Sequence, residues 1–141
     1  MKLRLPVAED FEYMTEHCIN RSREFKQLDA IDELVTLEHD GIPLLVGGFR
    51  MINSSTAWCW IDMSDDVSSN LIPVFRVIKG WIDMFIKERD LTRLQSFVRT
   101  DFDAAIRMVE HLGFKRESTM KDFFRDGDAF MYTRRPDGRE R

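Results

Sequence analysis

Hydrophobic and polar residues change their spacing several times along this chain, and each change predicts a new element. Apolar and charged residues alternate in Lys2–Pro6, which is the pattern of a short strand with one face in solvent. From Asp10 to Phe25 the apolar residues recur at helical spacing, and Asp10 is placed to cap the helix or to favour its first turn. Residues 26–31 are expected to end this helical region in a turn.

Two β-branched and apolar runs come next, separated by a short polar turn. Asp40–Gly41 between such runs is a strong hairpin signal, so we expect strands at Leu34–Glu38 and Pro43–Met51. Gly47–Gly48 within the second run indicates either a bulge or a close backbone approach. A turn at residues 53–55 then leads to a third strand.

The third strand, Ala57–Met63, ends in a polar elbow that runs into an amphipathic helix. Ser69 or Asn70 is the expected N-cap of that helix. A strand at Leu94–Thr100 and a helix over 101–114 follow, and a closing hairpin turns at Asp126–Gly127.

The resulting order is β-α-β-β-β-α-β-α-β-β. A strand, a helix and a further strand in succession favour a parallel pair, so we predict an α/β (α+β) fold with a mixed, largely antiparallel sheet. With 141 residues the chain is expected to form one domain over 1–135, followed by a charged tail at 136–141.

Composition narrows the class of protein. The hydrophobic share of 43% is that of a folded protein, and no apolar run approaches the ~18 residues that a membrane span needs. The early acidic residues argue against a signal peptide, so a cytoplasmic location is expected. A net charge of −4 argues against nucleic acid as a partner, and the scattered Cys18, Cys59, His17, His39 and His111 argue against a metal site.

The chain resembles the GNAT superfamily of N-acetyltransferases over nearly its whole length. The resemblance is carried by the opening "LRLPVAEDFEYM", by "AAIRMVEHLGFKRES" at the end of the last helix, and by the final hairpin with Gly127. A narrower resemblance is to the small acetyltransferase-like and virion-assembly proteins of T7-type bacteriophages. It is carried by "HDGIPLLVGG", "IRMVEHLGF" and "RDGDAFMYT". The resemblance implies a GNAT-like sheet with helices on both faces.

The resemblance also implies acetyl-CoA as cofactor, bound between two diverging strands with its pyrophosphate at a helix N-terminus. The elbow of this chain has no glycine, and Asp65 and Asp66 stand where a pyrophosphate would lie. The remaining donors are backbone amides of residues 69–72, serine hydroxyls, and Arg76 further along the helix. The implied cofactor-binding residues are Met63, Ser64, Ser68, Ser69, Asn70, Leu71, Arg76 and Val98.

Acetyl transfer to an amine needs a base that takes the amine proton. Asp62, at the end of the third strand, is the first candidate, and Glu38 is the second. Each carboxylate has an alternative interpretation as an ordinary surface or turn residue. The family's thiolate-protonating tyrosine falls on Val109, and its usual asparagine before the last helix is replaced by the stretch 101–103.

Aromatic residues are the candidates for contact with a substrate or partner. Trp58 and Trp60 share one face of the third strand, because side chains alternate along a strand. They either belong to the core or line a cleft for adenine, pantetheine or a partner. Phe124 and Tyr132 of the closing hairpin form either part of the core or an exposed patch, through which a homodimer or a host or phage protein could be bound.

Two functions therefore stay open. The first is a phage acetyltransferase that modifies an amine of a host protein or small molecule. The alternative is a GNAT fold without catalysis that acts by protein contact, in virion assembly or on a host factor.

Overall fold

The computed structural model describes residues 1–17 and 33–136. The chain divides into two compact units, one formed by Met1–Arg50 and Cys59–Arg76 and the other by Met51–Trp58 and Val77–Arg141. We call these unit 1 and unit 2. The expected single domain over 1–135 stays a prediction.

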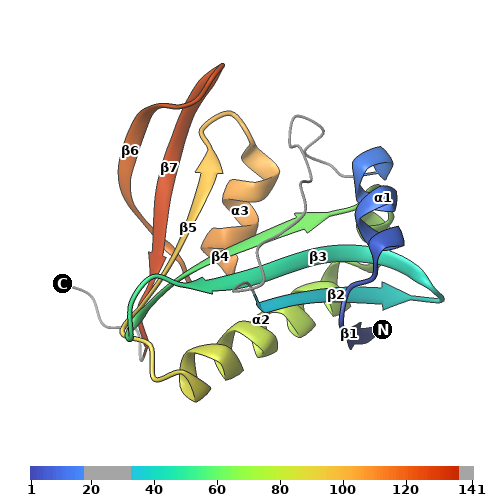
Figure 1. The fold of residues 1–141 in the computed structure, drawn as a ribbon. Helices are drawn as coiled ribbons and strands as arrows, with labels where there is room; N and C mark the ends of the chain where they lie inside the picture. Colours follow the sequence, from blue (N-terminus) through green and yellow to red (C-terminus); the bar gives the residue numbers. More distant parts are fainter. Residues whose placement is uncertain (18–32, 137–141) are drawn as a thin grey trace. The chain divides into compact units, whose positions relative to one another are not determined.

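Within the described residues, seven strands form one mixed sheet in the order β1-β2-β3-β4-β5-β7-β6 (Figure 1). The predicted element order and mixed α/β fold are confirmed. The strands are β1 (Lys2–Arg4), β2 (Glu33–His39), β3 (Ile42–Met51), β4 (Thr56–Met63), β5 (Arg93–Arg99), β6 (Lys115–Phe124) and β7 (Gly127–Arg134). The helices are α1 (Ala8–His17), the 3-10 helix η1 (Asp65–Asn70), α2 (Leu71–Glu88) and α3 (Asp103–His111).

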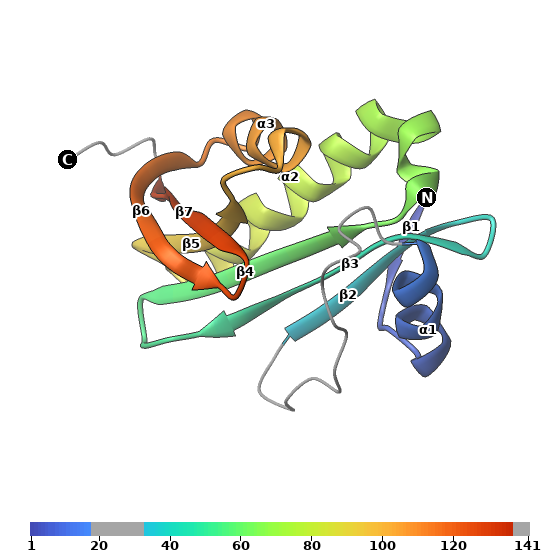
Figure 2. The same ribbon diagram turned by 90° about the horizontal axis from the view of Figure 1, so that it is seen from above.

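Unit 1 is built on the antiparallel strands β1, β2 and β3. The predicted turn at Asp40–Gly41 is confirmed, and both residues have positive φ (53° and 80°), as a tight two-residue hairpin requires. Figure 2 shows this hairpin and α1 from above. The core of the unit includes the fully buried side chains of Met14, Leu37, Leu44, Leu45, Val46, Phe49 and Val74.

Gly48 decides between the two interpretations of the glycine pair. A Cβ built on Gly48 would lie 2.9 Å from Leu34 Cδ2, 3.0 Å from Trp60 Nε1 and 3.1 Å from the Glu33 carbonyl oxygen. The bulge lies elsewhere, since the register shifts between Leu37 and Glu38. A close approach therefore explains why glycine occupies position 48.

Unit 2 contains the first residues of β4, most of α2, and β5, β7, β6 and α3. The expected parallel pair is present: β4 pairs with β5 in parallel from Thr56↔Arg93 to Trp58↔Gln95. β5 and β6 both pair with β7 in antiparallel fashion, which confirms the closing hairpin. The core of this unit includes Ile78, Ile82, Leu94, Leu112 and Tyr132.

β6 stands at the end of the sheet and is irregular. Its register against β7 shifts between Arg116 and Ser118 and again between Met120 and Phe124. Asp122 has a φ of 55°, and its backbone N–H donates to the Asp128 carboxylate at 2.8 Å. The strand is therefore bent out of a regular ladder at two places.

The α-helix after the elbow begins at Leu71, directly after the expected N-cap positions Ser69 and Asn70. The 3-10 helix η1 precedes it from Asp65 without a break, and Leu71 has helical φ and ψ (−59°, −47°). Ser64 is the N-cap position of η1, and the expected N-cap of α2 stays a prediction. Much of the predicted first helix beyond His17, including Cys18, lies outside the described residues.

Candidate active site

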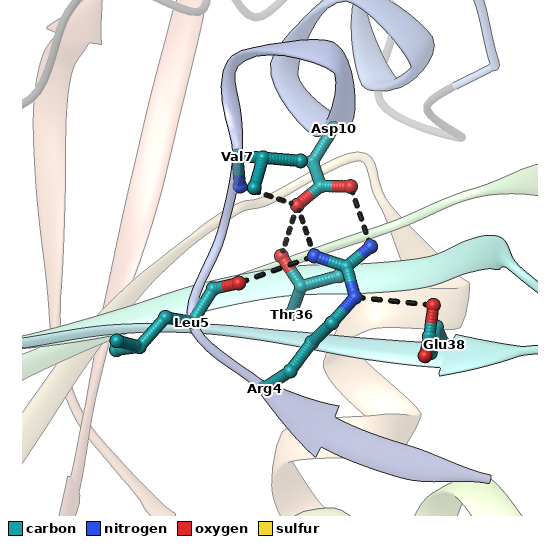
Figure 3. A network of polar contacts seen from close by, with 6 residues as sticks. All are labelled: Arg4, Leu5, Val7, Asp10, Thr36 and Glu38. Atoms are coloured by element: carbon teal, nitrogen blue, oxygen red, sulfur yellow. Dashed lines mark hydrogen bonds and ion pairs between the residues drawn. The ribbon is translucent and has the colours of Figure 1, made fainter.

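A polar network fixes α1 on the first two strands (Figure 3). Arg4 forms a two-pronged ion pair with Asp10, with N–O distances of 2.7 and 2.8 Å. The same carboxylate accepts hydrogen bonds from the Val7 amide at 2.8 Å and from the Thr36 hydroxyl at 2.9 Å. Asp10 is 2% exposed, so these four donors compensate a charge that would otherwise be costly to bury.

The network sets the protonation of Asp10. Burial alone would raise the pKa of this carboxyl, but the hydrogen bonds from Arg4, Val7 and Thr36 outweigh burial and lower the pKa. The hydrogen bond to Asp10 likewise raises the pKa of Arg4. Both side chains are therefore charged in the folded protein over the whole physiological range.

Glu38, the second candidate base, lies in the same network. Its carboxylate is 3.1 Å from Arg4 Nε, because β1 and β2 pair with Arg4 opposite Thr36. The structure thus gives Glu38 a partner in holding Arg4, and its part in catalysis stays a prediction.

Ser64 pins the elbow to β3. Its backbone N–H donates to the Leu44 carbonyl at 2.9 Å, and its hydroxyl donates to the Pro43 carbonyl at 2.9 Å. The residue is fully buried and its hydroxyl holds the elbow in place, and its part in cofactor binding stays a prediction. The hydrogen bond of the Val67 amide to the Ser64 carbonyl, at 3.2 Å, closes the first helical turn.

Asp66, in this first turn, is held by a residue that the sequence analysis did not single out. Tyr13 of α1 donates its hydroxyl hydrogen to Asp66 Oδ2, and the Ser64 hydroxyl lies 3.3 Å from the same oxygen. The hydrogen bond to Asp66 raises the pKa of Tyr13 to about 12, and burial adds to the effect. Tyr13 also stacks on His17 with ring centroids 4.1 Å apart.

Residues 69–72, whose amides are the expected donors to an anionic group, lie in a continuous helical run. Amides beyond the first turn of such a run bond to preceding carbonyls. The cofactor-binding role of these residues stays a prediction.

The other implied cofactor-binding residues come from several elements of the fold. Leu71 and Arg76 are exposed on α2, and Met63 is half-buried at the end of β4. The backbone of residues 68–70 belongs to η1, and their side chains are outside what the structure describes. Val98, 6% exposed, belongs to unit 2.

Asp62, the first candidate base, is buried on the strand that leads into the elbow. Asp62 is 4% exposed, and it lies two positions before Ser64 and two positions after Trp60. Strand alternation places Trp60 and Asp62 on one face of β4. A carboxylate in such a sheltered position can act on a reacting proton with little competition from bulk water.

The aromatic candidates differ in exposure. Trp60 and Tyr132 are buried, at 8% and 0%, and belong to the cores of units 1 and 2. The Tyr132 hydroxyl donates to Glu110 at 3.2 Å and accepts from Arg116 at 3.2 Å. Both residues are therefore core residues, and a part in binding a cofactor or partner stays a prediction.

Trp58 and Phe124 are half-buried in unit 2. Trp58 meets Phe97 edge to face with ring centroids 4.3 Å apart, and Phe97 in turn packs against Phe123 at 4.8 Å. Phe124 lies under the guanidinium of Arg99, 4.8 Å from its ring centroid. Phe123 is 38% exposed, so this aromatic group reaches the surface of the unit.

Val109 occupies the place where the GNAT resemblance puts a proton-donating tyrosine. It is half-buried on α3, and valine has no proton to donate.

Among the described helices, none has the length and apolar character that a membrane crossing requires.

Comparison with solved structures identifies the fold. The ribosomal-protein-S18-alanine N-acetyltransferase from Escherichia coli matches with a TM-score of 0.72 and 15% identity, covering 95% of this chain and 92% of the other. A spermidine N-acetyltransferase variant from Vibrio cholerae matches with a TM-score of 0.77, 13% identity and 96% and 95% coverage. Ard1 from Thermoplasma volcanium gives 0.75, 15% identity and 95% and 96% coverage.

The chain therefore has the GNAT fold of these N-acetyltransferases. Comparison of the sequence with protein-family models gives no match, and comparison with curated protein sequences gives none either. At 13–15% identity the structural likeness defines the architecture, and activity has to be argued from the residues of this chain.

Proposed function

We propose that this protein is an N-acetyltransferase that moves the acetyl group of acetyl-CoA to an amine. The observation that carries the proposal is a buried carboxylate, Asp62, on the strand that enters the elbow of a GNAT fold. The short parallel ladder between β4 and β5 also supports it, because it covers only the first three residues of each strand.

In the proposed reaction, Asp62 is the base. The cofactor supplies an acetyl thioester, whose carbonyl carbon is attacked by the acceptor nitrogen. Asp62 accepts the proton that the nitrogen loses as the new amide bond forms. The C–S bond breaks, and water protonates the departing thiolate, because Val109 cannot.

The first helical turn after Ser64 is the proposed anion-binding part of the site. The positive end of the helix dipole lies in this turn and favours the negative charge of the pyrophosphate. Arg76 lies more than a turn into α2, away from this first turn, so it attracts the anionic cofactor without bonding to the same group.

The source and acceptor belong to the same proposal. The likeness of "HDGIPLLVGG" and "RDGDAFMYT" to proteins of T7-type bacteriophages supports a phage protein that acts in the host cytoplasm. The acceptor is then an amine of a host protein or of a small molecule.

The decisive experiment combines cofactor binding with substitution of the base. Acetyl-CoA at about 100 times its Kd should add about 2.7 kcal/mol to the free energy of unfolding and raise the Tm. Asp62→Asn should keep this shift and lower kcat by about 10²–10⁴-fold in an assay of CoA release with a panel of amines. Asp103→Asn, an exposed carboxylate at the start of α3, is the matched control and should keep wild-type turnover.

Two outcomes would contradict the proposal. Turnover of Asp62→Asn equal to wild type removes Asp62 as base. Absence of any acetyl-CoA binding, by calorimetry and by thermal shift, removes the transferase function and favours the second candidate, a GNAT fold that acts by protein contact. Val109 at the tyrosine position and the acidic elbow are the observations that favour this alternative.

A further inference from the structure

Gly48 on β3 and Trp60 on β4 lie against each other within unit 1. A Cβ on Gly48 would lie 3.0 Å from Trp60 Nε1, so the indole lies over the bare backbone of this glycine. The same Cβ would lie 2.9 Å from Leu34 Cδ2, and Leu34 is the partner of Gly48 on β2. The indole therefore reaches across β3 toward β2, and a side chain at position 48 would collide with it.

The pairing of β3 with β4 places this indole next to the proposed base. The Ser64 amide donates to a carbonyl of β3, and the antiparallel register counted from this hydrogen bond brings Val46 opposite Asp62. Trp60 and Asp62 point to the same face of β4, and strand geometry separates them by about 7 Å. Trp60 and Val46 are both buried. Asp62 is therefore bordered by a buried apolar side chain along its own strand and by another across from it.

We propose that Trp60 is a positioning residue for the Asp62 base: its indole shields the carboxylate from water, and glycine at position 48 leaves the room that the indole needs. The inference rests on the proposed function. It assigns Trp60 no contact with the cofactor or the acceptor, because its effect passes through Asp62.

Shielding from water changes how a carboxylate works as a base. A carboxylate that water cannot fully solvate holds a proton more strongly than one in water. Such a base has a pKa closer to the working pH, which favours removal of the proton from the acceptor amine. Other ionisable side chains on this side of unit 1, among the described residues, are buried or half-buried and belong to β1, β2, α1 and η1. They are Arg4, Asp10, Tyr13, His17, Glu38 and Asp66.

Titration of the cofactor-free protein is the first test. Infrared spectroscopy follows the carboxyl band of Asp62, which is identified as the signal that Asp62→Asn removes. Trp60→Ala should lower the midpoint of this titration by at least about one pH unit, because water then reaches the carboxylate. Trp60→Phe keeps a flat apolar ring and should stay close to the wild-type midpoint. Trp81→Ala, at a half-buried tryptophan of α2, is the matched control and should leave the midpoint unchanged.

Gly48→Ala tests the same geometry from the neighbouring strand. The added Cβ displaces the indole, so the midpoint should move in the same direction as in Trp60→Ala. In a Trp60→Ala background the indole is absent, so Gly48→Ala should then move the midpoint no further. Additive shifts contradict the inference. Gly48→Ala also carries the test if Trp60→Ala does not fold, because an unchanged midpoint with the indole displaced overturns the inference.

Turnover separates this inference from the proposed function. The acid limb of the kcat–pH profile should follow the same order of midpoints, while the Kd for acetyl-CoA is unchanged. A purely structural role would lower the Tm without moving the midpoint. Equal midpoints in wild type and Trp60→Ala overturn the inference and leave the proposed function standing. Absence of turnover in wild type, with the shift of the midpoint present, removes the proposed function and keeps the shielding of Asp62.

Discussion

At the scale of single residues, two charged side chains, Arg4 and Asp10, each contact several residues that are distant in the sequence. Arg4 bonds to both Asp10 and Glu38, and Asp10 accepts from Arg4, Val7 and Thr36. These contacts join residues up to 34 positions apart, as between Arg4 and Glu38. The opening stretch of the chain therefore serves to fasten the first helix.

This network should make stability depend on acid pH. The pKa of Asp10 is lowered by folding, so its contribution is present above its unfolded value of about 3.9 and is lost as pH falls through the lower folded value. Asp10→Asn should cost about 2 kcal/mol near neutral pH and should flatten the decline in stability below pH ~4.

Urea unfolding at several pH values measures the Asp10 effect. Glu9→Gln, an exposed neighbour in the same helical turn, is the control and should follow the wild-type curve. Identical acid dependence of wild type and Asp10→Asn would show that this carboxyl contributes no proton linkage.

At the scale of elements, the spacing of apolar and turn residues predicted most helices and strands. It failed where contacts between residues distant in the sequence determine the structure. The hairpin at Asp40–Gly41 and the last hairpin follow from turn residues between apolar runs. The 3-10 helix η1 in front of α2 was not predicted, because the contacts of Ser64 with β3 help to fix where it begins. The Tyr13–Asp66 contact spans 53 positions, and no local pattern announces it.

The glycine pair in β3 gives a second example at this scale. The sequence allowed a bulge or a close approach, and the contacts of Gly48 decide for the approach. Gly48→Ala should destabilise the protein by about 1–3 kcal/mol, because the Glu33 carbonyl belongs to the backbone and cannot move away like a flexible side chain.

Thermal unfolding with a matched pair of variants tests this. A Cβ on Gly80 of α2 would meet nothing within 4 Å, so Gly80→Ala should stabilise the helix by about 0.5–1 kcal/mol. A Gly48→Ala variant as stable as wild type would remove the steric explanation for glycine at position 48.

At the scale of the whole molecule, the chain passes repeatedly from one compact unit to the other. It changes unit after Arg50, Trp58 and Arg76, so β4 and α2 each contribute to both. Neither unit is a continuous segment. The candidate base and the elbow lie in unit 1, although the strand that carries them begins in unit 2.

A fragment of residues 77–141 should therefore not fold alone. It lacks Thr56–Trp58, which pair with β5, and Ser55, whose carbonyl accepts the Thr92 amide at 2.8 Å. Circular dichroism should show no cooperative thermal transition for this fragment. Fragment 51–141, which restores these residues, is the comparison, and a cooperative transition in the shorter fragment would contradict the prediction.

The irregular edge at β6 has a consequence for behaviour at high concentration. A straight, unpaired strand offers a template on which other chains can add and grow into fibres. The two register shifts of β6 interrupt that template. The strand also carries charged residues, which disfavour the close approach of a second chain; they are Lys115, Arg116, Glu117, Lys121 and Asp122. This border of the protein is therefore built to resist polymerisation through its backbone.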